Sequence, residues 1–238
     1  MTAEARGDEP TAPWSEVRGP VLRTAAGVGV ATGAYGLSFG ALAGAAGLTV
    51  TQACALSVLT FTGGSQFALI SVLGAGGSIV SGSTSAVLLG ARNLLYGARL
   101  AGPLRLTGWR RALGAHLVMD ESTAVALAAE ERGDRAARLG FWATGVAVFV
   151  LWNLSTLIGA IAGTAIGDPR DYGLDAAVPA AFVALVAPRL RSLPTWLTAV
   201  AAAAVALAVV PFVPAGVPVL LAAVVPVFAV LVLKERAE

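Results

Sequence analysis

Residues 61–70 read FTGGSQFALI and interrupt the middle of an apolar run that extends over residues 51–73. Two adjacent glycines cost helix stability, and neighbouring Ser and Thr side chains compete for backbone hydrogen bonds. Inside a bilayer the cost is larger, because a freed amide or carbonyl finds no water there. The stretch therefore predicts one of two structures. The first is a discontinuous helix that binds a polar solute through exposed backbone groups, and the second is a kinked helix whose polar side chains bond to neighbouring helices.

The composition of the chain indicates a membrane protein. Of its 238 residues, 57% are hydrophobic and 13% are charged, whereas a soluble domain carries about 25% charged residues. Residues 24–91 contain no charged side chain at all. We predict an all-α, polytopic integral membrane protein with about seven transmembrane helices, one of which is broken by Gly and Ser in the N-terminal third of the chain.

Loop charges give the orientation of these helices. Under the positive-inside rule, the arginines of residues 99–111, Arg191 and Lys234 place their loops and the C-terminus in the cytoplasm. Three apolar segments then lie between two cytoplasmic ends, so either one of them, for which the broken segment is the candidate, crosses incompletely or the charge rule fails once. The expected segments cover residues 24–48, 51–73, 78–104, 112–129, 139–166, 176–187, 194–210 and 216–233.

The ends of the chain and its rare residues exclude several classes of protein. Residues 1–23 carry mixed charges and three prolines, and we predict a disordered or surface-lying cytoplasmic tail followed by one transmembrane domain at 24–238. Cys54 is the single cysteine and His116 the single histidine. A metal site or a catalytic pair would need more such residues, so we predict no metal site, no cofactor and no enzymatic activity. The net charge of +2 gives no reason to expect nucleic-acid binding.

The first apolar segment carries a face of glycines. At about 100° per residue these glycines fall within a sector of roughly 80°. Such a face favours close packing against another helix, although the flanking Tyr35 and Phe39 could instead contact a solute. The glycines are Gly29, Gly33, Gly36, Gly40, Gly44 and Gly47.

Three charged side chains are expected at membrane depth. Arg92 lies well inside the bilayer if residues 78–104 form one helix, and such an arginine is a candidate functional residue; otherwise it reaches the headgroups from the helix end. Asp120 and Glu121 lie near the middle of the apolar segment 112–129 and point in different directions. They either face a cavity and an arginine or lie in water on an interfacial helix.

Four motifs in one order resemble the AzlC family, the large subunits of two-component exporters of branched-chain amino acids. The motifs are YGLSFGALAGAAGL, FTGGSQFALI, LLGARNLLYG and HLVMDES, and the resemblance covers residues 25–235. The family typically has an Asn two residues before the arginine of the third motif, and this chain has Gly90 there. The resemblance implies export of valine, leucine, isoleucine and also methionine, with a small multi-span membrane partner of the AzlD type.

These motifs suggest how a zwitterion with an apolar side chain would be bound. Backbone amides of Gly63, Gly64 and Ser65 can meet a carboxylate, and Gln66 can orient it. Phe67, Phe39 and Tyr35 could line an apolar pocket.

The third and fourth motifs supply the remaining candidate residues. Asn93 and Tyr96 join the substrate-binding candidates, and Arg92, Asp120 and Glu121 are the coupling candidates. One carboxyl group could carry a proton, because removal from water favours its neutral form.

A secondary transporter driven by the proton gradient is thus the leading hypothesis, because the chain contains no GxxxxGK[ST] loop for ATP. A channel, which would pass solute without a gradient, and a purely structural subunit remain the alternatives. An intramembrane enzyme is a distant third.

Overall fold

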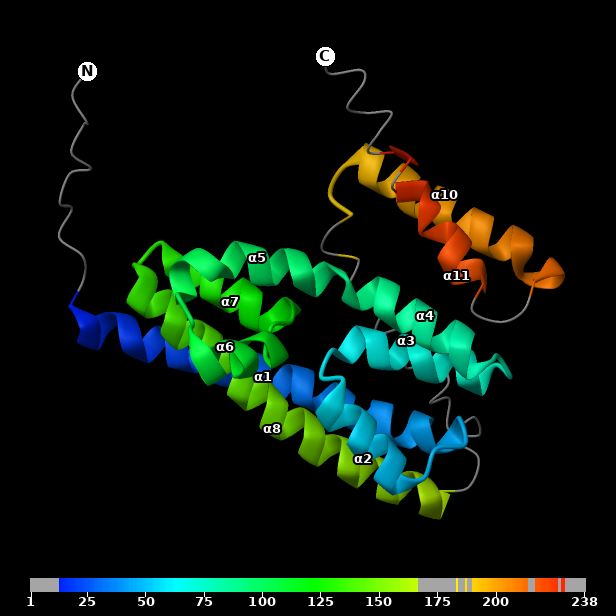
Figure 1. Cartoon of the computed structure of the whole chain (residues 1–238), viewed down its shortest axis with the longest axis horizontal. Coiled ribbons are helices and arrows are strands. Elements are labelled where there is room, and N and C mark those ends of the chain that lie inside the picture. The colour runs from blue at the N-terminus through cyan, green and yellow to red at the C-terminus, as the bar shows by residue number, and fades with distance from the viewer. Residues whose placement is uncertain are drawn as a thin grey trace. The chain divides into compact units, whose positions relative to one another are not determined.

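The structure is a computed structural model that describes residues 13–166, 190–213, 217–226 and 228–229 and the single positions 183 and 187. Every regular element among these residues is helical, which confirms the all-α prediction. The elements are α1 (Trp14–Ala45), α2 (Val50–Leu59), α3 (Gly63–Gly74), α4 (Ile79–Gly90), α5 (Arg92–Leu104), α6 (Gly108–His116), α7 (Asp120–Glu130), α8 (Asp134–Ile166), α10 (Leu193–Val209), η4 (Val210–Phe212) and α11 (Val217–Ala222) (Figure 1).

The membrane class is confirmed by the lengths and composition of the helices. Three of the described helices are long and apolar enough to cross a bilayer, at Trp14–Ala45, Asp134–Ala165 and Leu193–Phe212. The number of full crossings stays a prediction. Of the predicted segment 176–187, only positions 183 and 187 are described. The loop 167–175 and Lys234 lie outside the described residues.

The chain divides into two compact units. Unit 1 consists of Met1–Gly33 and Asn93–Leu151, and unit 2 of Ala34–Arg92 and Trp152–Glu238. Helices α1 and α8 each contribute residues to both units.

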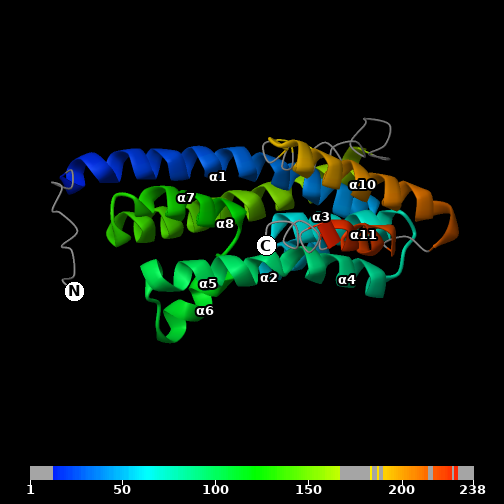
Figure 2. The same ribbon diagram turned by 90° about the horizontal axis from the view of Figure 1, so that it is seen from above.

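Unit 2 contains the predicted helix break, but Gly63, Gly64, Ser65 and Gln66 lie in the first turn of the following helix rather than in the break itself. The apolar run 51–73 forms two helices, α2 and α3, separated by Thr60–Thr62. Helix α3 packs along α4 (Figure 1), and α10 pairs with α11, as Figure 2 also shows. In the candidate span Leu193–Phe212, no residue of the most apolar 18-residue stretch is buried.

Four glycines of the predicted face, Gly29, Gly33, Gly36 and Gly40, pack closely against α8, whereas Gly44 and Gly47 contact no neighbouring element among the described residues. In unit 2, a Cβ on Gly36 would lie 2.6 Å from the Trp152 carbonyl oxygen, and one on Gly40 would meet the Thr156 carbonyl oxygen and lie 2.6 Å from the Ala160 amide nitrogen. In unit 1, Gly29 lies against Ala147 in the same way. The helix that the glycines require is thus a part of this chain.

The packing continues from the side of α8. A Cβ on Gly159 would meet the Leu37 carbonyl oxygen, and one on Gly163 would lie 3.2 Å from the Ala41 Cα. Glycines on both helices therefore bring the two backbones together within unit 2.

In unit 1, α1 begins at Trp14 rather than at residue 24, so the predicted tail is too long. Val17 and Val21 are buried with Ala129 and Ala136. The Arg135 guanidinium lies 4.0 Å from the ring centre of Trp14, a cation–π geometry. Apolar burial and this contact explain why residues 14–23 are helical despite their charges.

The prediction of one helix over residues 112–129 is wrong. This segment lies in two helices, α6 and α7, with Leu117–Met119 between them. The Ser122 hydroxyl donates to the Leu117 carbonyl at 2.6 Å and accepts the Met119 N–H at 3.2 Å. Asp120 and Glu121 therefore open α7, where the positive end of the helix stabilises negative charge, and do not lie in mid-helix.

The predicted helix over residues 78–104 is also interrupted. Helix α4 ends at Gly90, Ala91 is its C-cap, and α5 starts at Arg92. Arg92 therefore sits at a junction between two helices rather than within one continuous span.

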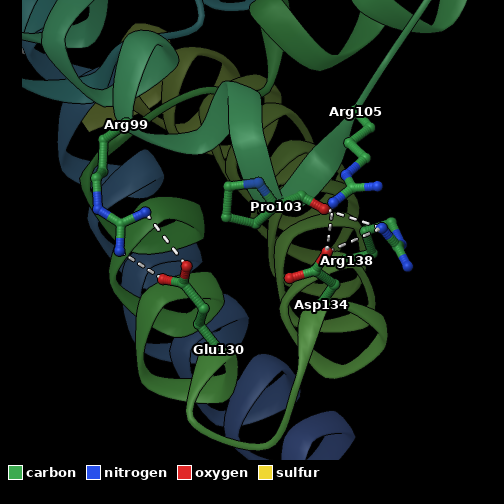
Figure 3. A network of polar contacts seen from close by, with 6 residues as sticks. All are labelled: Arg99, Pro103, Arg105, Glu130, Asp134 and Arg138. Atoms are coloured by element: carbon green, nitrogen blue, oxygen red, sulfur yellow. Dashed lines mark hydrogen bonds and ion pairs between the residues drawn. The ribbon is translucent and has the colours of Figure 1, made fainter. Parts of the chain in front are cut away.

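Polar contacts tie α5 to α7 and α8 within unit 1 (Figure 3). Arg99 binds both carboxylate oxygens of Glu130, at 2.6 and 3.3 Å. Arg138 donates to the Pro103 carbonyl at 2.9 Å and lies 4.0 Å from Asp134. The charged side chains of these two ion pairs are partly exposed, between 29% and 54%, so each ion pair contributes at most about 1 kcal/mol.

Candidate substrate site

The helix break in unit 2 is held by the side-chain amide of Gln66. Its Nε2 donates to the carbonyl oxygens of Ser57, Leu56 and Thr60 at 3.1, 3.2 and 3.4 Å. The last carbonyls of a helix lack partners within the helix, and in lipid no water replaces them. From the first turn of α3, the Gln66 side chain thus donates hydrogen bonds to carbonyl oxygens at the C-terminal end of α2.

The other end of the same amide bonds to α8. Trp152 Nε1 donates to Gln66 Oε1 at 3.0 Å. The amide has only one orientation that fits these partners, because its nitrogen must face the three carbonyls and its oxygen must face the Trp152 N–H. Gln66 is 1% exposed, and both ends of its side chain have protein partners. Its predicted role as a substrate ligand stays a prediction, and the structure adds a role in positioning the break.

Three aromatic rings enclose this amide network. Phe39, Phe67 and Trp152 are buried, and their ring centres are 5.7 to 6.0 Å apart. Phe39 stacks on Trp152, and Phe67 meets both rings edge-on. The predicted aromatic residues Phe39 and Phe67 are therefore brought together at the break, whereas Tyr35 is half-exposed.

The two glycines at the start of α3 allow side chains to approach the backbone. A Cβ on Gly63 would lie 3.1 Å from Trp152 Cη2, and one on Gly64 would lie 3.0 Å from Arg92 Nη2. The N-cap residue Thr62 makes no side-chain bond to the helix. Within the described part of the chain, the Gly63 and Gly64 amides have no hydrogen-bond acceptor. The first turn of α3 therefore offers donors beside a guanidinium.

The remaining candidates belong to unit 1. The Tyr96 hydroxyl donates to Asp120 Oδ1 at 2.7 Å, and this bond links α5 to the start of α7. Glu121 follows in the same first turn, and Asn93 lies in the first turn of α5. The structure thus pairs two predicted site residues, Tyr96 and Asp120, that lie far apart in the sequence.

Sequence reasoning missed the part played by α8. Trp152 supplies both a ring and a donor, and Thr156 accepts the Ser57 hydroxyl at 3.3 Å. A tryptophan in mid-span is a usable signal, because its N–H needs a partner when buried. The sequence does not reveal which acceptor that partner is.

We expect Trp152→Phe to lower the thermal midpoint of the purified protein. The variant keeps an aromatic ring but leaves Gln66 Oε1 without its donor, and a buried unsatisfied polar atom costs about 1–3 kcal/mol. Trp142→Phe is the control, because Trp142 packs on Phe141 and the same change there removes no such bond. Equal midpoints for the two variants, measured by thermal unfolding in detergent, would contradict this role for Trp152.

The fold and the site together define a class of protein. A polytopic helical chain whose apolar helices include a broken one with buried polar and aromatic side chains is an integral membrane protein. A family model described as AzlC protein matches residues 27–166, more than half of the chain. The chain belongs to the AzlC family, as its motifs predicted.

A search of curated proteins adds one relative. The chain is 29% identical over 156 residues to the Inner membrane protein YgaZ of Escherichia coli (strain K12). The match covers 63% of each protein, so the chain spans less than two thirds of the length of that relative. No solved structure matches this chain.

Proposed function

We propose that this protein is the large permease subunit of a secondary transporter that exports branched-chain amino acids such as valine, leucine and isoleucine, and also methionine. Family membership supports transport as the general activity. In this proposal the protein lies in the cell membrane with its C-terminus in the cytoplasm, and the inner-membrane relative supports that location.

The observation that carries the proposal is the chemistry at the break in unit 2. The Gly63 and Gly64 amides have no acceptor among the described residues. A Cβ on Gly63 would lie 3.1 Å from the Trp152 ring, which itself packs with the buried rings of Phe39 and Phe67. An amino acid with an apolar side chain would present its carboxylate to the backbone amides and its hydrocarbon side chain to the aromatic rings. Gln66 and Trp152 act by holding the two half-helices in place.

We also propose a small multi-span partner of the AzlD type, on the strength of the family resemblance. The glycines of α1 do not require this partner, because Gly29, Gly33, Gly36 and Gly40 already pack against α8. The unburied span of α10 leaves a surface that either lipid or a partner helix would cover.

The test is efflux of labelled valine, leucine, isoleucine and methionine from cells that express the chain with and without the small partner. We expect efflux of these solutes only when both chains are present. Full export by the purified single chain in liposomes would remove the partner from the proposal, and no efflux of any of the four would overturn the proposed substrates.

We expect Asp120→Asn to abolish efflux driven by a proton gradient while preserving exchange of solute across the membrane. Asparagine keeps one oxygen for the Tyr96 hydroxyl, which donates to Asp120 at 2.7 Å. It removes the charge and the titratable proton and replaces the second oxygen by an NH2 group. An exchanger does not need net proton movement, so only the driven mode should fail.

Glu121→Gln is the matched comparison in the same turn of α7. We expect it to reduce both modes, as an ion-pair partner would. Paired efflux and exchange assays at equal protein abundance separate these results. Full driven efflux by both variants would place the coupling group elsewhere.

A further inference from the structure

The Ser65 hydroxyl is a buried polar group that the fold leaves unused. Ser65 lies in the first turn of α3 and is 6% exposed, and its Oγ has no hydrogen-bond partner among the described residues. Other buried hydroxyls of unit 2 differ, since Ser57 donates to Thr156 and Ser85 to the Ser81 carbonyl. A lone buried hydroxyl costs free energy, so its retention needs a reason.

Gly90 leaves space next to this hydroxyl. A Cβ built on Gly90, at the end of α4, would lie 3.0 Å from Ser65 Oγ. Apart from its chain neighbours and the backbone of its own helix, it would meet no other atom of the described residues within 4 Å. Any side chain at position 90 would therefore occupy the position from which a ligand atom can reach Ser65.

The groups around this position are hydrogen-bond donors or carry positive charge. The Gly63 and Gly64 amides begin α3, and Arg92 Nη2 lies 3.0 Å from the Cβ position of Gly64. Helix N-termini and guanidinium groups both favour an anion.

We propose that Ser65, Arg92 and the first amides of α3 form a carboxylate subsite, and that Gly90 keeps it open. This inference rests on the proposed function and specifies which end of the substrate is selected by charge. The subsite recognises the carboxylate and not the ammonium group. Branched-chain 2-oxo acids, which carry the same carboxylate and side chain without the amine, are therefore ligands of this site.

The experiment titrates the full-length chain in lipid nanodiscs by calorimetry with four ligands of one side-chain shape. The ligands are leucine, 4-methyl-2-oxopentanoate, leucinamide and 3-methylbutylamine. We expect the two carboxylates to bind with similar affinity. Leucinamide and the amine should bind at least about tenfold more weakly, because a charge-assisted hydrogen bond contributes roughly that factor.

Two variants test the residues without unfolding the protein. Ser65→Ala should weaken both carboxylates about tenfold while leaving the thermal midpoint unchanged or raised, because it removes an unsatisfied group. Gly90→Ala should weaken them as well, since its methyl group would fill the space beside Ser65 Oγ, while alanine favours the helix. Ser57→Ala is the control, because it breaks the bond to Thr156. It should lower the midpoint and leave the ratio of leucine to leucinamide affinity unchanged.

The outcomes separate this inference from the proposed function. If leucine is bound and exported but Ser65→Ala binds it normally, or leucinamide binds as well as leucine, the subsite is wrong and the export proposal stands. If the 2-oxo acid binds in a Ser65-dependent way and leucine does not, the subsite stands and the proposed substrate is wrong. If neither carboxylate binds the intact chain, the subsite is overturned.

Discussion

Gln66→Ala is expected to abolish export while the protein remains in the membrane. The substitution removes the Nε2 donor of the Ser57 and Thr60 carbonyls and the acceptor of the Trp152 N–H. The Leu56 carbonyl keeps the Thr60 N–H and hydroxyl as donors. Each buried polar group left without a partner costs about 1–3 kcal/mol, and the two half-helices lose the bonds that set their separation. Labelled-leucine efflux at equal membrane abundance, with thermal unfolding of the purified variant, measures both effects.

A second substitution at position 66 shows whether the donor half of the amide is required, and a substitution at Gln52 is the control. Gln66→Glu keeps the length and an acceptor for Trp152 but cannot donate to the carbonyls when ionised, so export should also fail. Gln52→Ala is the control, since Gln52 only completes the exposed capping box of α2 with Thr49. It should cost at most about 1 kcal/mol and preserve export. Normal export by Gln66→Ala would remove this residue from both the positioning and the binding role.

Gly40→Ala is expected to prevent the chain from reaching its folded state in the membrane. Its methyl group would meet the Thr156 carbonyl oxygen and lie 2.6 Å from the Ala160 amide nitrogen. Both contacts are to backbone atoms of α8, which cannot rotate away as a side chain can, so α1 and α8 would have to separate in unit 2. We expect little folded protein by fluorescence-detected size exclusion.

Gly44→Ala tests whether this loss comes from packing or from a glycine requirement of α1 in general. Apart from its chain neighbours and the backbone of α1, no atom of the described residues lies within 4 Å of a Cβ on Gly44. Alanine favours a helix over glycine by up to about 1 kcal/mol, so this variant should fold at least as well as the unsubstituted protein. Similar yields for the two variants would contradict the packing of Gly40 against α8.

The class of protein follows from the sequence because solvent acts on composition directly. Residues 24–91 contain no charged side chain, and so long an uncharged, apolar stretch favours the lipid bilayer over water. The break at Thr60–Thr62 follows for a similar local reason, since paired glycines and hydroxyls disfavour continuation of the helix. The glycine periodicity of α1 likewise predicts a close helix neighbour.

Boundaries set by tertiary contacts were not predictable in this way. The helical state of residues 14–23 depends on the burial of Val17 and Val21 against Ala129 and Ala136, which are distant in sequence. The division of residues 112–129 into α6 and α7 depends on one hydroxyl, that of Ser122, which bonds the backbone at the break. A serine has several competing uses, and hydropathy does not distinguish among them.

The sequence by itself determined that this is a helical membrane protein of the AzlC family with a polar break near Gly63 and Gly64 and a glycine face on α1. Only the tertiary structure decided that α8 covers that face in unit 2, that Gln66 bonds to α2 and Trp152, and that the Ser65 hydroxyl remains without a partner among the described residues. The physical reason is range. Hydropathy and backbone propensity act within a few residues, whereas the partner of a buried amide or hydroxyl is chosen by packing between helices that lie far apart in the chain.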